Sequence, residues 1–440
     1  MKILIIAHYF PSENNMAMMA TLRPLSWAKS WSKAGHDICV LTTAKTENQN
    51  LQSQLSSNIS GSVRIEGVKY LLSRPEINTK PQVNTQNKRF SLYPFLRKIL
   101  INTRQFIGAG SLFYSSDLWI FPAIKKGLAI YQEWQFDVIV STFGPPASHI
   151  VASALKKKLN VFWVADYRDL WHDHHFSRAR FPFSFIEKNL ENTTVKNADV
   201  MTTVSLPLAE KLTKRFKKNI VTITNGFECS PINKTLSYVY SEIKKVQIAY
   251  TGNLYLQKQD IQLLFQAINL LVKQDANIQK NLEVLFYGWD TGNLNEIIKQ
   301  YCLENVVSIK GFVPREVAIS LQRNVDALIF LDWNDKNEHG ILTGKLFEYM
   351  FSGTPILGIG ASLETAAGRL IQESGTGVLL GRSIEAIANT IKKLLNGESL
   401  EYSPKAEVLQ HYTREFLANK MLQEIIESYT NFAKSHTTNK

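Results

Sequence analysis

The feature that most constrains this chain is a repeated order of elements, in which an apolar strand is followed by a loop and an amphipathic helix. The first such unit has a strand at residues 2–7, a helix at 22–34 that Gly35 closes, and a second strand at 36–42. Strands that alternate with helices predict a parallel sheet covered by helices on both faces. We therefore expect an α/β fold whose ligands bind at the carboxyl ends of the strands.

The same order of elements continues along the chain and divides it. Further strands are expected at 136–141, 161–166, 200–204, 246–251, 282–287, 306–310, 327–331, 355–358 and 377–380. Irregular sequence interrupts the pattern from about residue 43 and again at 225–237. We predict two Rossmann-like domains facing a central cleft, at 1–230 and 231–412. An insertion is expected at about 44–110, and a final helix with a polar tail at 413–440 is expected to pack back towards the first domain.

Composition excludes several classes of protein. The 440 residues include only three cysteines and no CxxC pair, which argues against a disulfide framework or a thiolate zinc site and favours a reducing compartment (Cys39, Cys229, Cys302). We expect neither a signal peptide nor a transmembrane span, because polar and turn residues break the apolar runs. The net charge of +12 fits nucleic acid, an anionic membrane or a polyanionic small substrate. No nucleic-acid-binding motif accompanies the charge, so we disfavour that partner.

Two loops at expected strand ends carry candidate groups in the first half. Residues 8–15, HYFPSENN, follow the first strand and lack the GxGxxG fingerprint of dinucleotide sites. Residues 164–171, VADYRDLW, place Asp166, Arg168 and Asp169 at the end of another strand. Loops in this position often carry function, and an ordinary connection is the alternative. The histidines that follow have no clear acidic partner, so we expect a surface loop and no metal site (His172, His174, His175).

Two loops in the second half favour a bound phosphate. Residues 251–258, TGNLYLQK, combine a glycine turn, which lets the backbone approach a ligand closely, with the point charge of Lys258. Residues 337–357 contain a glycine-containing loop followed by a helix. Lys345 is expected in the first turn of this helix and Glu348 one turn later. Helix amides favour a diphosphate, and a carboxylate can accept paired hydrogen bonds from ribose hydroxyls. A surface salt bridge between Lys345 and Glu348 is the alternative.

Together these elements resemble the family 4 glycosyltransferases of GT-B fold, over nearly the whole chain. In the first half the similar motifs are HYFP at 8–11, AGHD at 34–37, DVIVST at 137–142, GPP at 144–146, WVADYRDLW at 163–171, TVS at 203–205 and NGF at 225–227. In the second half they are YTGN at 250–253, GFV at 311–313, KLFEYM at 345–350 and GTP at 353–355. Each motif is weak alone, but their order and spacing are specific.

The resemblance implies transfer of a sugar from a nucleotide-activated donor, UDP- or GDP-linked, with retention at the anomeric carbon and no metal or other cofactor. The first domain would bind the acceptor and the second the donor. Lys258 and Lys345 would hold the donor diphosphate, Glu348 the ribose, and Asp166 would act beside the acceptor. Further donor contacts are expected at Gly252, Asn253, Gly288, Phe312, Val313, Thr343 and Gly344. Acceptor contacts are expected at His8, Asn14, Asn15, Arg168 and Asp169.

The chain departs from the family pattern in two places. The family often has a glutamate eight residues before the position of Glu348, where this chain has Gly340, with Glu338 nearby. The glycine pair that many members carry in the first loop is replaced near Asn14 and Asn15. These departures affect the contacts expected to the donor sugar and to the acceptor.

Residues 88–107 combine apolar side chains with five basic ones, Lys88, Arg89, Arg97, Lys98 and Arg104. A basic amphipathic helix can lie on an anionic membrane surface, and an ordinary helix packed on the sheet is the alternative. We expect a cytoplasmic enzyme, with association at the inner face of the membrane left open. Its expected acceptor is a glycan or a lipid-linked molecule in cell-surface polysaccharide synthesis.

Two other functions stay open from the sequence. One is a sugar-nucleotide epimerase of the same fold, which would need acid and base residues around the sugar. The other is a non-catalytic relative that binds a sugar nucleotide or a glycan, which Gly340 alone favours. Release of a nucleoside diphosphate distinguishes transfer from both.

Overall fold

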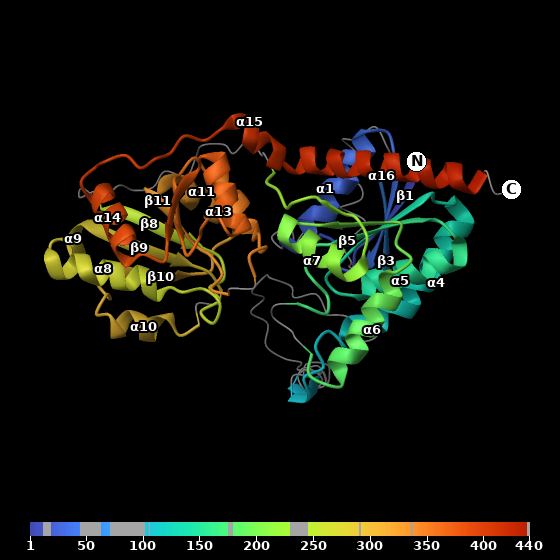
Figure 1. Ribbon diagram of the computed structural model, residues 1–440, viewed down its shortest axis with the longest axis horizontal. Coiled ribbons are helices and arrows are strands. Elements are labelled where there is room, and N and C mark those ends of the chain that lie inside the picture. The colour runs from blue at the N-terminus through green and yellow to red at the C-terminus, as the bar shows by residue number, and fades with distance from the viewer. Residues whose placement is uncertain are drawn as a thin grey trace, which may run out of the picture. The chain divides into compact units, whose positions relative to one another are not determined.

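The computed structural model divides into two compact units (Figure 1). Unit 1 comprises Met1–Ile223 and Leu417–Lys440, and unit 2 comprises Thr224–Phe416. The structure describes residues 1–11, 19–44, 63–70, 102–104, 106–174, 179–228, 245–289, 292–335 and 338–437. Within these ranges each unit is built on its own parallel sheet. The two Rossmann-like domains expected from the sequence are present.

The described residues of unit 1 form a seven-stranded sheet in the order β3-β2-β1-β4-β5-β6-β7. Its strands are β1 (Lys2–Ile6), β2 (Asp37–Thr43), β3 (Val63–Val68), β4 (Val138–Thr142), β5 (Phe162–Tyr167), β6 (Val200–Thr203) and β7 (Ile220–Thr222). Its helices are α1 (Met19–Lys33), η2 (Ser115–Trp119), α4 (Ile120–Trp134), α5 (Ala147–Leu159), α6 (Phe183–Val195), α7 (Leu206–Phe216) and α16 (Arg414–Thr437).

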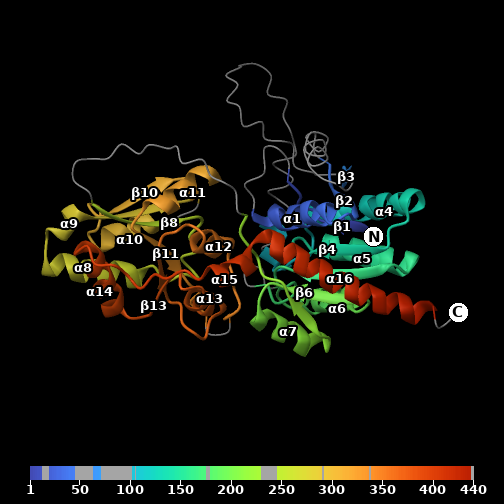
Figure 2. The same ribbon diagram turned by 90° about the horizontal axis from the view of Figure 1, so that it is seen from above.

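Side chains alternate along each strand, so both faces of the unit 1 sheet are apolar. On β1, Ile3 and Ile5 pack in a core with α1 and α16, whereas Leu4 and Ile6 pack in a core with α4 and α5. Figures 1 and 2 both show α16 lying alongside α1. Five apolar residues anchor α16 in that core (Leu417, Ala418, Met421, Leu422, Ile425).

Part of the range expected as an insertion belongs to the sheet. Strand β3 pairs in parallel with β2, from Ile38 opposite Val63 to Thr43 opposite Val68. Its sequence, VRIEGV, buries Val63 and Ile65, while Arg64 and Glu66 form ion pairs with each other and with α4. The alternation is the mark of a strand with one buried face.

The described residues of unit 2 form a six-stranded sheet in the order β10-β9-β8-β11-β12-β13. The strands are β8 (Val246–Thr251), β9 (Leu282–Tyr287), β10 (Val307–Gly311), β11 (Ala327–Leu331), β12 (Ile356–Ile359) and β13 (Gly377–Gly381). The helices are α8 (Gln262–Gln274), α9 (Ile278–Asn281), α10 (Leu294–Gln300), α11 (Arg315–Asn324), α12 (Gly344–Met350), α13 (Ala366–Ser374), α14 (Ile384–Leu395), α15 (Ala406–Leu409) and η3 (Gln410–Tyr412).

The order of strands places a topological switch point in each unit. In unit 1 the chain moves across the sheet in one direction from β1 to β3 and in the opposite direction from β4 to β7. In unit 2 it does the same from β8 to β10 and from β11 to β13. A crevice is expected where the two directions diverge. The switch points are β1/β4 in unit 1 and β8/β11 in unit 2. Among the helices that the structure describes, none has an apolar stretch long enough to cross a bilayer.

Candidate active site

The loops after β8 and β11 are bound to each other at the switch point of unit 2. The Asn334 amide donates to the Lys258 carbonyl oxygen at 2.6 Å. The Lys258 ammonium pairs with a carboxylate oxygen of Asp335 at 3.2 Å. These contacts hold Lys258 at the carboxyl end of the sheet, where a ligand of an open α/β sheet binds.

Lys345 lies on α12 and reaches the end of β8. Its Nζ is 3.8 Å from the centre of the Tyr250 ring, donates to the Tyr250 hydroxyl, and donates to the Asn253 carbonyl at 3.3 Å. A Cβ on Gly252, which has φ +113°, would be 3.4 Å from this nitrogen. Burial lowers the pKa of Lys345 to about 7, against the opposite effect of Glu348. Lys345 is thus a cation whose charge is easily removed.

Glu348 is tied to α11 and β8. It accepts from Arg315 Nε at 2.9 Å and from Gln322 Nε2 at 3.5 Å. Gln322 also donates to the Thr251 hydroxyl at 2.8 Å. A surface salt bridge between Lys345 and Glu348 was the alternative expected from the sequence, but Glu348 forms an ion pair with Arg315. This orientation fixes the carboxylate beside the carboxyl end of β8.

The remaining expected donor contacts fall into two groups. Gly288 approaches the β8 loop so closely that a Cβ there would lie 2.4 Å from the Gly252 carbonyl oxygen, which explains the glycine. After β10, Phe312 is half exposed and stacks on Trp289 at 4.2 Å, with Val313 next in the chain.

Thr343 and Gly344 begin α12, which is only seven residues long. Gly340, in place of the family glutamate, is buried, and so is Glu338, whose amide donates to the Asp335 carbonyl at 3.0 Å. Glu338 therefore lies near the loop that carries Asp335, the partner of Lys258.

In unit 1, His8 is buried at the end of β1. Its ring makes edge contacts with Tyr9 and Trp119 at 4.7 and 5.2 Å between centres. Its amide donates to the Ser148 hydroxyl of α5 at 3.2 Å. His8 therefore lies at the switch point of unit 1, where its side chain is largely enclosed by aromatic rings.

Asp166 is fully buried and its two carboxylate oxygens are occupied. Arg23 donates to both, at 3.1 and 2.7 Å, and the hydroxyls of Thr142 and Thr202 each donate at 2.8 Å. Burial alone would raise the pKa of Asp166, but Arg23 and the hydroxyls outweigh it and lower the pKa. Through these bonds Asp166 joins three strands to α1. Its expected action beside the acceptor stays a prediction.

Arg168 and Asp169 lie in the loop after β5. Arg168 Nε is 3.6 Å from an Asp169 carboxylate oxygen, and the Arg168 guanidinium lies against Gly144, where a Cβ would be 2.5 Å from it. Gly144 has φ +102° and follows β4. The two expected acceptor residues are therefore adjacent to the GPP motif at the carboxyl edge of the sheet.

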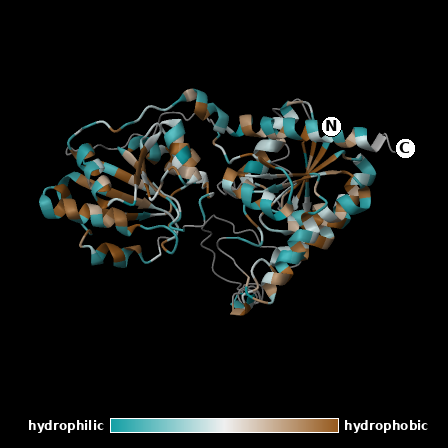
Figure 3. Ribbon diagram, viewed as in Figure 1, coloured by the Kyte–Doolittle hydropathy of each residue, from teal (hydrophilic) through white to brown (hydrophobic). Residues whose placement is uncertain are grey.

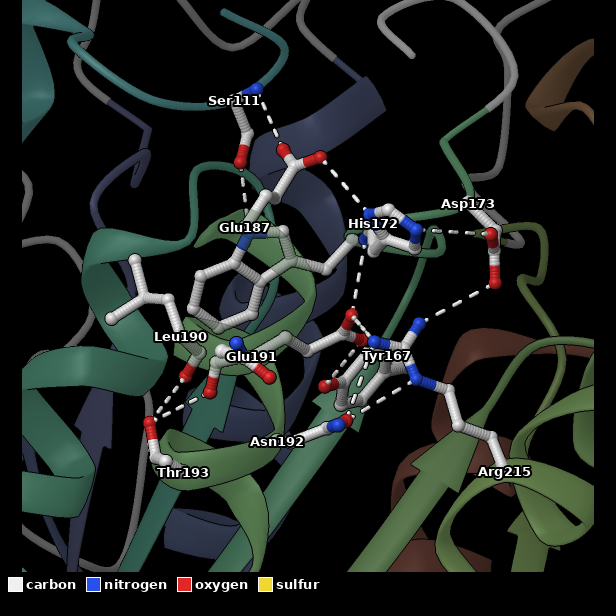
Figure 4. Close-up of polar contacts among 12 residues, drawn as sticks. Ser111, Tyr167, His172, Asp173, Glu187, Leu190, Glu191, Asn192, Thr193 and Arg215 are labelled. Atoms are coloured by element: carbon white, nitrogen blue, oxygen red, sulfur yellow. Dashed lines mark hydrogen bonds and ion pairs between the residues drawn. The ribbon is translucent and has the colours of Figure 1, made fainter. Parts of the chain in front are cut away.

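A buried network beneath this loop was not foreseen from the sequence (Figure 4). The half-buried His172 Nδ1 lies 3.3 Å from Glu187, and the His172 amide donates to Glu191 at 3.2 Å. Arg215 of α7 pairs with Glu191 at 2.7 Å. Burial raises the pKa of Glu191 to about 7. His172 is thus an internal tether and not the surface residue that we expected, because its acidic partners come from a helix fifteen or more residues away.

Several expected residues lie outside the described ranges, namely Asn14, Asn15, His175 and most of 88–107. Sequence reasoning also missed partners of the donor residues, including Tyr250, Arg315, Gln322 and Asp335. Tyr250 looked like a core residue of a strand, and Arg315 is 33 positions from Glu348, so no local spacing linked them. In the described part of the chain, no group of three or more His, Cys, Asp or Glu residues is arranged to hold a metal ion.

Comparison with known families decides the class of the protein. A family model described as "Glycosyltransferase Family 4" matches residues 25–230, and one described as "Glycosyl transferases group 1" matches residues 245–397. The chain belongs to the family 4 glycosyltransferases. No curated protein sequence matches this glycosyltransferase significantly.

Solved structures show the same fold. The glycosyltransferase is similar to sucrose-phosphate synthase from Thermosynechococcus elongatus, with a TM-score of 0.61, 13% identity and coverage of 98% and 99% of the two chains. The structure of TarM matches with a TM-score of 0.57 and 11% sequence identity, covering 97% of this chain and 98% of TarM. The structure of UDP-GlcNAc 2-epimerase from Methanocaldococcus jannaschii matches with a TM-score of 0.51 and 12% sequence identity, covering 97% of this chain and 100% of the epimerase. A sucrose-phosphate synthase and an epimerase share this fold, so the fold alone does not choose between glycosyl transfer and epimerisation.

Proposed function

We propose that this glycosyltransferase moves a sugar from a nucleoside-diphosphate donor to a glycan or lipid-linked acceptor, with retention of anomeric configuration. The observation that carries the proposal is the convergence of Lys258, Lys345 and Glu348 at the β8/β11 switch point of unit 2. Two cations beside a close backbone approach suit a diphosphate, and a fixed carboxylate suits ribose hydroxyls.

In this reaction the bond between the anomeric carbon and the diphosphate oxygen breaks, and its electron pair stays on the departing phosphate. The acceptor hydroxyl oxygen bonds to the anomeric carbon, and we propose that its proton passes to a donor phosphate oxygen. Lys258 and Lys345 would stabilise the negative charge that develops on the leaving group. Arg168 and Asp169 of unit 1 would position the acceptor, in the production of a cell-surface polysaccharide or glycolipid.

A thermal-shift panel of UDP, GDP, ADP and CMP tests the donor site, because a ligand that binds only the folded state raises its stability. We expect one diphosphate to shift the melting temperature selectively. Glu348→Gln should weaken its binding by roughly tenfold or more, since a hydrogen bond to a charged group contributes about 1.5–3 kcal/mol. Glu316→Gln, an exposed glutamate on the neighbouring helix α11, is the matched control.

Equal nucleotide affinity in Glu348→Gln and Glu316→Gln would remove Glu348 from the donor site. Turnover of the nucleotide sugar then separates the remaining functions. A transferase releases the nucleoside diphosphate, whereas an epimerase converts one nucleotide sugar into another without releasing it. A binding protein does neither.

A further inference from the structure

Two segments of unit 1 that are distant in sequence, 106–114 and 179–188, are packed together and form a surface that we call the Phe tip. The Arg180 amide donates to the Gly108 carbonyl at 2.8 Å, and the Ser111 amide donates to Glu187 at 2.7 Å. The rings of Phe113 and Phe183 meet edge to face at 6.0 Å. The Phe tip is therefore a defined surface and not an isolated loop.

Large apolar side chains on the Phe tip are exposed. Phe106 and Phe181 are each 86% exposed and Phe185 is 63% exposed. Phe113 and two isoleucines add to the same surface (Ile107, Ile186). Figure 3 shows hydrophobic stretches at this end of unit 1, which Figure 1 places at the beginning of α6. Scattered single apolar residues are ordinary, but a group of this size marks a binding surface.

The backbone at Phe113 is strained as well as exposed. Its φ of +61° lies in the left-handed region, where a bulky residue is costly and glycine is usual. The ring is still 53% exposed, so burial does not offset that cost. A strained residue that keeps an exposed aromatic ring points to a contact with another molecule.

The charges on the Phe tip have one sign. Arg180 and Lys188 are exposed, and the partly exposed Arg104 adjoins the tip with its guanidinium 3.7 Å from the centre of the Tyr114 ring. Between 104 and 114 and between 179 and 188 the one acidic residue is Glu187, which is buried and bound to the Ser111 amide.

We propose that the Phe tip docks on an anionic lipid surface. Exposed phenylalanines insert at the boundary between headgroups and acyl chains, and flanking arginine and lysine side chains are attracted to anionic headgroups. The exposed charges of the Phe tip are all positive, which complements anionic headgroups. The proposal rests on the Phe tip alone and is independent of the proposed reaction. The Phe tip is largely distinct from the basic segment 88–107 discussed above. The two share Phe106 and Ile107.

Cosedimentation of the full chain with vesicles tests the proposal. We expect binding to vesicles that contain phosphatidylglycerol, weaker binding at high salt, and little binding to phosphatidylcholine alone. The double variant Phe106→Ser with Phe181→Ser should lose roughly tenfold in binding, and Arg180→Glu a similar factor. The matched controls are Leu363→Ser and Lys280→Glu, which change an exposed leucine and an exposed lysine of unit 2 and should bind as the wild type does.

Melting temperatures confirm that each variant is folded before its binding is compared. Absence of vesicle binding by the wild type would overturn the proposal. Equal binding by the tip variants and the controls would also overturn it, because the contact would then lie elsewhere. Self-association of the wild type that the tip variants abolish, without vesicle binding, would assign the surface to a second copy of the chain instead.

Discussion

Lys345 and Glu348 lie one turn apart on α12, yet their surroundings differ. Lys345 sits over the Tyr250 ring and beside the Asn253 carbonyl. Glu348 has an arginine at 2.9 Å. A cation with a pKa lowered to about 7 by burial gains most from an anionic ligand, because the ligand restores the charged form.

The first prediction concerns the pH dependence of nucleotide binding. A diphosphate favours protonated Lys345, so affinity for UDP or GDP should fall as pH rises from 7 to 9, by up to about tenfold per unit. The second phosphate ionisation, near pH 6, is complete in this range. Isothermal titration calorimetry at several pH values measures the nucleotide affinity. The same titrations should show proton uptake on binding near neutral pH.

Lys345→Arg serves as the control, because a guanidinium stays charged across this range. Its affinity should vary little with pH, and Lys345→Met should bind weakly at every pH. A wild-type profile that is as flat as that of Lys345→Arg would contradict a role for Lys345 protonation.

The second prediction concerns Asp166. Removing one partner of a buried ion pair costs about 3–5 kcal/mol, so Asp166→Asn should lower the free energy of unfolding by that amount. The folded-state pKa is below the ordinary value of 3.8, so this carboxylate's contribution is present above that pH and is lost as pH falls through the folded-state pKa. Chemical denaturation at pH 7 and at acidic pH measures both effects.

Asp169→Asn is the matched control, because its side chain is far more exposed. It should change stability by less than about 0.5 kcal/mol. A folded, equally stable Asp166→Asn with lost activity would instead restore Asp166 as a residue of the reaction.

At the scale of elements, α6 holds the loop after β5 in place. Glu187 and Glu191 are one turn apart and face inward, where they bind Ser111, His172 and Arg215 (Figure 4). The indole of Trp171 adds a hydrogen bond to the Ser111 hydroxyl at 2.8 Å. Arg168 and Asp169, the proposed acceptor residues, are in this loop, so its geometry depends on α6.

The third prediction follows from that dependence. Glu187→Leu leaves the Ser111 amide without its acceptor and should destabilise unit 1 by about 2–4 kcal/mol. Glu187→Gln still presents an oxygen to that amide and should cost less. The exposed Glu210→Leu on α7 is the control. Denaturant titration ranks the three variants, and equal stability of Glu187→Leu and Glu210→Leu would contradict the tethering role.

The elements themselves were largely predictable from the sequence. The expected strands at 2–7, 246–251 and 282–287 match β1, β8 and β9 within a residue, because buried parallel strands are short continuous apolar runs. Strand β3 was missed, since six residues between irregular segments gave a weak signal. Helix α4 was not assigned for a similar reason, because aromatic and polar residues obscure its period.

At the scale of the molecule, the chain returns to unit 1 after completing unit 2. Residues Leu417–Lys440 belong to unit 1, and the Trp31 indole donates to the Ala418 carbonyl at 2.8 Å. Unit 1 is therefore complete only when the last helix has been made. Deleting that helix would uncover the core face formed by α1 and β1.

The fourth prediction tests this dependence. Met421 is fully buried, so Met421→Asp places a charge in the unit 1 core and should cost more than about 4 kcal/mol. Hydrogen exchange should show lost protection in 1–223 and retained protection in 245–413. Lys420→Asp, at the exposed neighbouring position, should leave both units protected. Equal loss of protection in the two units would show that they unfold together.

The sequence by itself determined the α/β class, the two Rossmann-like domains and the family, because hydrophobic period and motif order are local properties of the chain. Tertiary structure decided what each candidate side chain does. Asp166 lies near the end of β5 and Glu348 lies on α12, but Asp166 accepts four hydrogen bonds in a closed core, whereas Glu348 accepts from an arginine and a glutamine beside the switch point. Their partners come from positions tens or hundreds of residues away. Burial and charge pairing are set by those distant partners, and no local pattern records them.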